Sequence, residues 1–206
     1  MTNEQIRDMF RQAAEVLETK EMELCAIDAE TGDGDHGIAA AAVAKAIREV
    51  CDGKEPKDAD VFFSDLCMAV MRLNGGSCIP LCANMFDQMA EACMGMEDSP
   101  QRMKAAFAGA LEGIGFISDA KPGQKTMVDA LSPAVEAAQL CTGDEKEILH
   151  SAAKAARSGS EATRNMIAQY GRAKNLKEDS LGHLDAGSVT IAIFLEAMSA
   201  YADANV

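Results

Sequence analysis

The sequence predicts an all-α protein, organised as an antiparallel up-and-down bundle of eight helices. Apolar residues recur with helical spacing along nearly all of its 206 residues, and alternating strand-like runs are missing from the sequence. The 5 prolines and the clustered glycines stand between the periodic segments, where they punctuate helices. Hydrophobic residues make up 48% of the chain, enough for a core, and no long linker divides it. We therefore expect a single helical domain over residues 1–206.

The predicted helices can be justified in order along the chain. In the first, Ile6, Phe10 and Leu17 share one apolar stripe, and Thr2 or Asn3 is available as the N-terminal cap. The remaining seven are expected over approximately residues 39–50, 61–73, 81–94, 103–117, 128–140, 146–168 and 188–201. The connections at residues 52–56 and 141–144 are typical of simple turns.

Composition excludes several classes of partner and location. The formal net charge of −14 repels phosphate backbones, which argues against nucleic acid. A basic segment followed by an apolar one is not seen at the start, and no apolar run approaches the roughly 20 residues that span a bilayer, so we expect neither export nor membrane insertion. Seven cysteines without CxxC spacing indicate reduced thiols and a cytoplasmic protein. Cys78 and Cys82 are four residues apart, which would place two thiols on one helical face, although a soft metal there would need further ligands.

The most informative connection contains three aspartates, Asp28, Asp33 and Asp35, interrupted by glycines. Carboxylates this close repel one another unless a cation neutralises them, and hard oxygen ligands suit Mg²⁺ or Ca²⁺. The spacing is not that of an EF-hand. Because Mg²⁺ binds proteins through one or two carboxylates together with substrate phosphates, a phosphate ligand is indicated. The alternative is that Asp33 or Asp35 only caps the following helix.

Two further connections have features of anion sites. Residues 74–78 place Gly75 and Gly76 just before a helix, where exposed backbone N–H groups bind anions. In residues 121–127, Lys125 or Thr126 is positioned to meet a phosphate, or Thr126 caps the next helix.

The last informative connection, residues 182–187, contains His183 and Asp185 before a helix. Asp185 is suited to N-terminal capping, and His183 is of a kind more often structural than catalytic. The chain contains neither GxxxxGK[ST] nor GxGxxG after a strand. The residues alone thus indicate a helical domain whose loops gather a carboxylate metal site and anion-binding amides.

These four connections, in this order, resemble those of the nucleotide-binding L subunit of dihydroxyacetone kinase over nearly the whole chain. The most specific segments are residues 32–37, 121–129 and 182–187. The resemblance implies an eight-helix antiparallel barrel with ADP or ATP capping one end. It also implies that Asp28, Asp33 and Asp35 hold two Mg²⁺ ions that bridge the phosphates and form the catalytic centre.

The same resemblance implies further contacts and partners. The implied nucleotide contacts are His36 near the nucleotide, Gly76, Ser77 and Cys78 of the Gly-Gly loop at the phosphates, Met127 at the adenine, Arg172, and Asp185, Ala186 and Gly187 at the rim. Clustered Mg²⁺ would neutralise charge on the transferred phosphoryl group. A K-type subunit would hold the acceptor, dihydroxyacetone, through a histidine. In one branch of the family an M-type phosphotransferase-system protein rephosphorylates bound ADP, and in the other ATP exchanges freely.

The sequence departs from the family pattern at three places. Ile38 and Ala39 replace a segment that usually holds an asparagine, Cys78 and Ile79 replace a serine and a glycine, and Ala186 replaces a proline. Ile79 does not readily take positive φ, which predicts a different path for its loop. The metal ligands are intact, so we expect binding of metal and nucleotide, with dihydroxyacetone, another ketose or a triose as acceptor. One alternative is a non-catalytic nucleotide- or metal-sensing regulator, and another is a bundle with unrelated capped loops.

Overall fold

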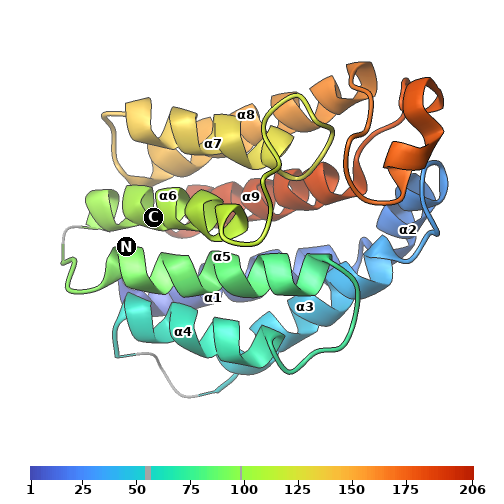
Figure 1. Ribbon diagram of the computed structural model, residues 1–206. Coiled ribbons are helices and arrows are strands. Elements are labelled where there is room, and N and C mark those ends of the chain that lie inside the picture. The colour runs from blue at the N-terminus through green and yellow to red at the C-terminus, as the bar shows by residue number, and fades with distance from the viewer. Residues whose placement is uncertain (54–56, 98) are drawn as a thin grey trace.

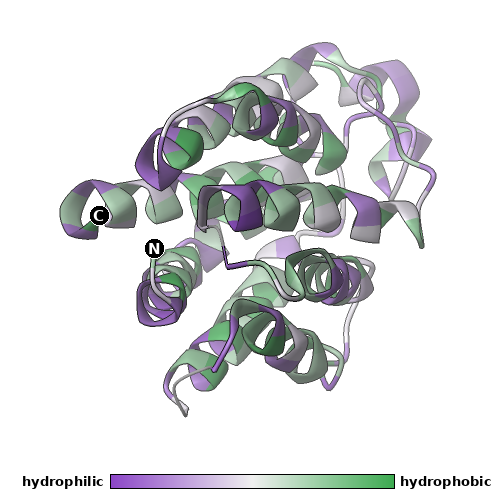
Figure 2. Cartoon of the chain, turned by 90° about the vertical axis from the view of Figure 1, so that its left-hand side faces the viewer, coloured by the Kyte–Doolittle hydropathy of each residue, from purple (hydrophilic) through white to green (hydrophobic). Residues whose placement is uncertain are grey.

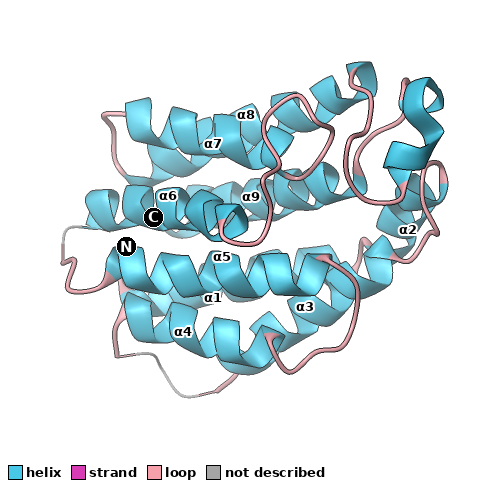
Figure 3. Ribbon diagram, viewed as in Figure 1, coloured by secondary structure: helices cyan, strands magenta, loops and turns pink. Residues whose placement is uncertain are grey.

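The computed structural model describes residues 1–53, 57–97 and 99–206, and within them it consists of helices and loops (Figures 1 and 3). The α-helices are α1 (Asn3–Glu18), α2 (Glu21–Ala29), α3 (His36–Cys51), α4 (Ala59–Val70), α5 (Cys78–Cys93), α6 (Ser99–Gly115), α7 (Val128–Leu140), α8 (Glu145–Ala162) and α9 (Ala186–Asn205). Two 3₁₀ segments, η1 (Thr163–Asn165) and η2 (Ala173–Ser180), precede α9. The turn predicted at residues 52–56 lies largely outside the described residues.

Eight of these helices form a closed antiparallel ring. Each of α3 to α8 packs against the next α-helix along the chain, and α1 packs against both α3 and α9, which closes the ring. Successive helices run in opposite directions (Figure 1). The predicted eight-helix antiparallel barrel is therefore confirmed. The short helix α2 is an addition that the sequence analysis missed, because its only buried residue is Leu24 and a single apolar position makes no stripe.

The core combines many alanines with larger aliphatic side chains and a cluster of phenylalanines, and Figure 2 shows hydrophobic and hydrophilic residues on each of the long helices. The Phe10 ring lies 5.5 Å from that of Phe62 and 5.6 Å from that of Phe194, both in edge-to-face orientation. On α6, a Cβ atom at Gly113 would stand 2.2 Å from the carbonyl oxygen of Asn84, so glycine lets α5 and α6 approach closely. None of the described helices is both long enough and apolar enough to cross a membrane.

The up-and-down path brings the four informative connections to one end of the barrel. In Figure 1 the loops after α2 and α8 lie at the right-hand end and those after α4 and α6 lie between that end and the middle, whereas both chain ends lie at the left. This is what an antiparallel ring dictates for alternate connections. The bounds of individual helices agree less well with the sequence prediction. Helix α3 begins at His36, three residues before the predicted start, and α8 ends at Ala162, six residues before the predicted end.

Candidate functional site

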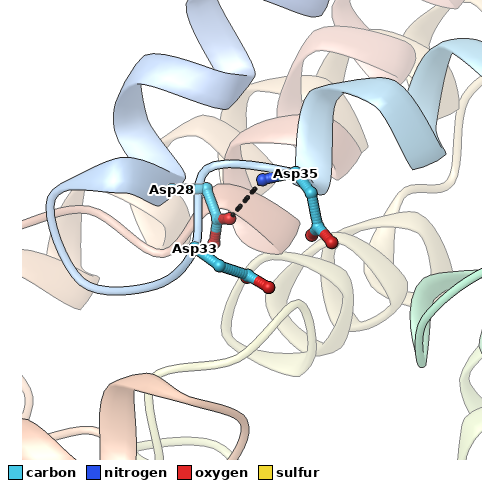
Figure 4. Close-up of side chains that lie close together, drawn as sticks. All are labelled: Asp28, Asp33 and Asp35. Carbon is cyan, nitrogen blue, oxygen red and sulfur yellow. Dashed lines mark hydrogen bonds between the residues drawn. The ribbon is translucent and has the colours of Figure 1, made fainter.

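The carboxylate loop is organised around Asp28, the penultimate residue of α2. Its Oδ2 accepts hydrogen bonds from the backbone N–H groups of Gly34, Asp35 and His36, at 2.9, 3.1 and 3.4 Å, and Figure 4 shows the one from Asp35. Gly34 has a φ of +76°, which allows the chain to turn back over the end of α2. The turn gathers the side chains of Asp28, Asp33 and Asp35, and one carboxylate oxygen of each lies within 4.8 Å of the others. The clustering predicted from sequence is present.

The donor chemistry of this cluster fits a hard divalent cation. Three carboxylates supply oxygen ligands, and Asp33 and Asp35 are exposed to solvent. Because the backbone N–H groups bind Asp28 Oδ2, its Oδ1 is left for a ligand. A Cβ at Gly32 would stand 2.8 Å from that Oδ1, so a side chain at residue 32 would crowd it. The Arg172 guanidinium lies 2.8 Å from Asp33 Oδ2 and partly neutralises the cluster. In the described residues this is the one group of three or more side chains with metal-ligand geometry.

His36 connects the carboxylate loop to α9. Its Nε2 lies 2.8 Å from Thr190 Oγ1. Burial lowers the pKa of His36, and the carboxylates of Asp28 and Asp35 act in the opposite direction. The next residue is Gly37, where a Cβ would stand 2.0 Å from the carbonyl oxygen of Glu21, so α2 and α3 can meet only with glycine at this position. His36 therefore lies beside the carboxylates, and its implied position near the nucleotide stays a prediction.

The Gly-Gly loop, residues 74–77, is exposed and leads directly into α5. Ser77 occupies the N-cap position, yet its side chain makes no capping hydrogen bond to the helix. Ile79 N–H donates to the Gly76 carbonyl and Pro80 has no N–H, so among the first three residues of α5 it is the N–H group of Cys78 that is left for an anion. Ile79 is the second residue of α5, is 5% exposed and does not adopt positive φ. The path of the loop therefore accommodates isoleucine by starting the helix before it.

The third loop is fixed by a buried lysine. Lys125 has a φ of 59° and is 3% exposed, and its Nζ donates to the carbonyl oxygens of Thr163 and His183 at 2.8 and 2.6 Å. Burial lowers the pKa of Lys125. The side chain joins three segments from beneath, so the prediction that Lys125 meets a phosphate is wrong. Thr126 follows the alternative, because its Oγ1 accepts a hydrogen bond from the backbone N–H of Val128 at the start of α7.

Asp129 is a residue whose role the sequence analysis missed. It is 4% exposed, and its two carboxylate oxygens accept hydrogen bonds from the backbone N–H groups of Gly123 and Thr126. This carboxylate holds the third loop in place from the first turn of α7. Asp129 is the last residue of the specific segment 121–129, and that position could have indicated its role in the sequence.

The fourth loop ends at Asp185, which caps α9. Its Oδ2 accepts from the backbone N–H of Ser188 at 2.6 Å, and its own N–H donates to Thr163 Oγ1 at 3.0 Å. Burial raises the pKa of Asp185 to about 7. A Cβ added at Gly187 would stand 3.3 Å from the Cβ of Met127, and both Met127 and Ala186 are buried. These residues come together as the predicted rim requires, and their contact with a nucleotide stays a prediction.

Two side-chain contacts join the first and fourth loops across the end of the barrel. His183 Nδ1 lies 2.9 Å from Glu30 Oε2, and Arg172, from the segment between η1 and η2, reaches Asp33. Together with the bonds from Lys125, these contacts make the first, third and fourth loops one connected surface. The partner of His183 is thus the Glu30 carboxylate, which agrees with the structural role that the sequence analysis favoured for this histidine.

The comparison with known families gives one match over most of the chain. The model of the DAK2 domain matches residues 30–200. Among curated relatives, the ADP-binding subunit DhaL of PEP-dependent dihydroxyacetone kinase 1 from Listeria innocua is 31% identical over 183 residues, covering 89% of this chain and 88% of the relative. The corresponding subunit from Escherichia coli is 25% identical over 203 residues, covering 97% of each chain.

Longer proteins contain the same unit. The human triokinase/FMN cyclase is 32% identical over 182 residues, covering 86% of this chain and 32% of the relative. The crystal structure of the dihydroxyacetone kinase of C. freundii with AMP-PNP and Mg²⁺ superposes with a TM-score of 0.76 at 23% identity, covering 97% of this chain and 34% of that one. At this identity the likeness shows the fold, and this chain spans about a third of the length of those two proteins.

Proposed function

The chain belongs to the DAK2-domain family, and on that premise we propose that it is the nucleotide-binding subunit of a small-ketose kinase, which takes ADP or ATP with Mg²⁺. The observation that carries this proposal is the aspartate cluster, which lies at the same end of the barrel as the start of α5, where the Cys78 N–H group is left for an anion. Cations and phosphates bind best where carboxylates and amide donors face the same space. The kinase names of the relatives support the reaction class.

Each aspartate has a distinct part in the proposed metal site. Asp28 fixes the loop through Oδ2 and offers Oδ1, while the exposed Asp33 and Asp35 supply the remaining ligands for two Mg²⁺ ions. When bound, Mg²⁺ would supply electrostatic stabilisation of the transferred phosphoryl group. Arg172 is 72% exposed and would exchange Asp33 for a phosphate, because a divalent cation displaces a surface ion pair of little strength.

The proposed nucleotide lies across the connected loops. Its phosphates would meet the backbone at Gly76, Ser77 and Cys78, and nothing lies within 4 Å of a Cβ position at Gly76, so the main chain there is accessible. His36 would complete the phosphate end. The adenine would lie at the rim formed by Met127 and residues 185–187, whose close packing supports a fixed binding surface.

The acceptor and the partners belong to the same proposal. The L. innocua and E. coli relatives are named as subunits of PEP-dependent dihydroxyacetone kinases, which supports dihydroxyacetone or a related ketose as acceptor. We place that acceptor on a K-type substrate-binding subunit, and we propose an M-type phosphotransferase-system protein as phosphodonor where ADP stays bound. The proposed location is the cytoplasm.

The first experiment measures binding by thermal unfolding. ADP with Mg²⁺ should raise the melting temperature of the wild-type protein, because a ligand that binds only the native state stabilises it. Asp33→Asn should abolish the Mg²⁺-dependent part of the rise. The matched control is Asp65→Asn, on the exposed face of α4 outside the loops, which should keep the full rise. An equal rise in wild-type and Asp33→Asn would refute the metal assignment.

A transfer assay separates the kinase from the regulator considered above. The altered start of α5 favoured a regulator, but Ile79 fits the helix without strain, so only Cys78 still supports that alternative. Mixed with a K-type subunit, Mg²⁺ and either ATP or a phosphorylated M-type protein, the chain should phosphorylate dihydroxyacetone. Nucleotide binding with no transfer to dihydroxyacetone, other ketoses or trioses would identify the regulator.

A further inference from the structure

The first turn of α5 carries two thiols in contact. Cys78 Sγ and Cys82 Sγ lie 4.0 Å apart, and both side chains are half-buried. Both line the apolar interior of the barrel, a cavity of about 130 Å³, at the end where the Gly-Gly loop enters α5 (Figure 1). The four-residue spacing noted in the sequence therefore produces a dithiol directly beneath the proposed phosphate site. Neither metal nor nucleotide binding, as proposed, gives Cys82 a role.

The two thiols are chemically unequal. The hydrogen bond between the two sulfurs lowers the pKa of Cys78, and the same hydrogen bond together with burial raises the pKa of Cys82 well above its usual value. Cys78 is also the first residue of α5, where the N-terminal end of a helix stabilises a thiolate. Cys78 is thus the nucleophile of the pair, and Cys82 is placed to resolve a product formed on it.

Joining these sulfurs would deform the start of α5. A disulfide needs an S–S distance of about 2.05 Å and Cβ atoms about 3.5–4.5 Å apart, whereas residues four apart on a helix have Cβ atoms about 5–6 Å apart. The first turn is weakly held: Ile79 N–H donates to the Gly76 carbonyl at 3.3 Å, Leu81 N–H donates to the Ser77 carbonyl at 3.2 Å, and Pro80 has no N–H. Tightening this turn necessarily moves the carbonyls of Gly76 and Ser77.

We propose that Cys78 and Cys82 form a reversible disulfide on reaction with a hydroperoxide, and that the disulfide weakens binding of the nucleotide phosphates. This inference rests on the proposed nucleotide site. The Cys78 thiolate attacks one peroxide oxygen, so an S–O bond forms, the O–O bond breaks, and the leaving oxygen takes a proton. Cys82 then attacks the sulfenic sulfur, the S–S bond forms, and the second oxygen leaves as water. The two thiols lose two electrons, and the hydroperoxide is reduced to water and an alcohol or a second water.

The coupling works in both directions. If the disulfide lowers the affinity for nucleotide, bound nucleotide must disfavour the disulfide by the same factor, because the two equilibria are linked. Phosphates over Ser77 and Cys78 also cover the nucleophile. Nucleotide bound at the site is therefore expected to slow oxidation of Cys78.

The experiment uses the full chain, hydrogen peroxide and isothermal titration with Mg²⁺ and ADP. Peptide mapping by mass spectrometry without reductant should find Cys78 joined to Cys82 after oxidation. The oxidised protein should bind Mg-ADP about tenfold more weakly, within the usual range of such couplings, and dithiothreitol should restore the affinity. Cys82→Ser, with Cys82→Ala as a second variant, cannot form the disulfide. After the same peroxide treatment each should still bind Mg-ADP as tightly as it does before treatment. Cys141→Ser, which removes a half-buried thiol at the opposite end, should behave as wild-type.

The outcomes are distinguishable. A protein that binds Mg-ADP but forms no Cys78–Cys82 disulfide, or one whose oxidised and reduced forms bind equally, overturns the dithiol inference and leaves the proposed function intact. An equal loss of affinity in wild-type and Cys82→Ser also overturns it, since Cys82 would then have no part. A reduced protein that does not bind Mg-ADP overturns the proposed function, together with the effect of oxidation on binding.

Discussion

The two ends of the barrel begin their helices differently. At the end opposite the site, α1 and α8 start with complete capping boxes, formed by Thr2 with Gln5 and by Asp144 with Glu147. At the site end, α3, α5 and α7 start at N-caps whose side chains make no capping hydrogen bond. The division has an exception on each side, since α9 is capped by Asp185 and α4 has no side-chain cap.

This difference shows where the site end obtains its order. A capped helix start satisfies its own N–H groups, whereas an uncapped start leaves them for something else. At the site end, charged side chains below the loops replace the caps: Asp28 gathers the first loop, Asp129 the third, and Lys125 joins the third to the fourth. The start of α5 has no such support, and it is the start to which we assign the phosphates.

The largest expected effect comes from removing one of these supports. Asp28→Ala should lower the free energy of unfolding by about 3 kcal/mol without any ligand, because it removes the acceptor of three backbone N–H groups. Asp33→Ala is the matched variant, and it should change the value by no more than about 0.5 kcal/mol, since its partner Arg172 is exposed. Urea unfolding of the ligand-free variants measures both. Equal losses would show that Asp28 and Asp33 stabilise the loop to the same extent, so that Asp28 would not be its particular support.

The next effect is a dependence of stability on pH at the one capped helix start of the site end. The pKa of Asp185 is raised to about 7 by burial, above the ordinary value of 3.8. The folded protein therefore holds this proton more tightly than the unfolded chain, and the stability it contributes is present below about pH 4 and is lost as pH rises through about 7. As pH rises from about 4 to about 7, ionisation of Asp185 should lower the free energy of unfolding by roughly 2 kcal/mol in total. This is about half of what the pKa shift alone implies, because the side chain is partly exposed.

Asp185→Asn is the variant that isolates this term. Asparagine keeps the capping oxygen for Ser188 but does not titrate. Urea unfolding at pH 5, 6, 7 and 8 should show wild-type losing stability relative to Asp185→Asn as pH rises. A constant difference between the two proteins would mean that Asp185 titrates normally and is as well solvated as a cap at the other end.

The sequence predicted the long helices and the carboxylate cluster for the same reason: both depend on spacing along the chain. Apolar periodicity located the eight ring helices, and three aspartates within eight residues had to lie close together. The short α2 escaped because Leu24 alone gives no period. Lys125 was misplaced because its burial depends on carbonyls at Thr163 and His183, distant in sequence, and on a positive φ that the lysine itself does not indicate. Cross-loop contacts of this kind require the fold before they can be seen.

The smallest effect tests the comparison of caps directly. Thr2→Ala should lower the free energy of unfolding by about 1 kcal/mol, because it removes the hydroxyl that accepts from Gln5 N–H. Ser77→Ala should change it by less than about 0.3 kcal/mol, since the Ser77 hydroxyl caps nothing and its backbone is already helical, a conformation that alanine favours at least as much as serine. The same Ser77→Ala protein should nevertheless bind Mg-ADP more weakly, because it loses a hydroxyl that would donate to a phosphate beside the backbone N–H groups, whereas Thr2→Ala should bind it as wild-type does. If Ser77→Ala instead loses as much stability as Thr2→Ala, the Ser77 hydroxyl caps α5 as Thr2 caps α1, and it is not left for a ligand. The two ends of the barrel would then begin their helices alike, and the phosphates would have to bind elsewhere on the loops around Asp28, Asp33 and Asp35.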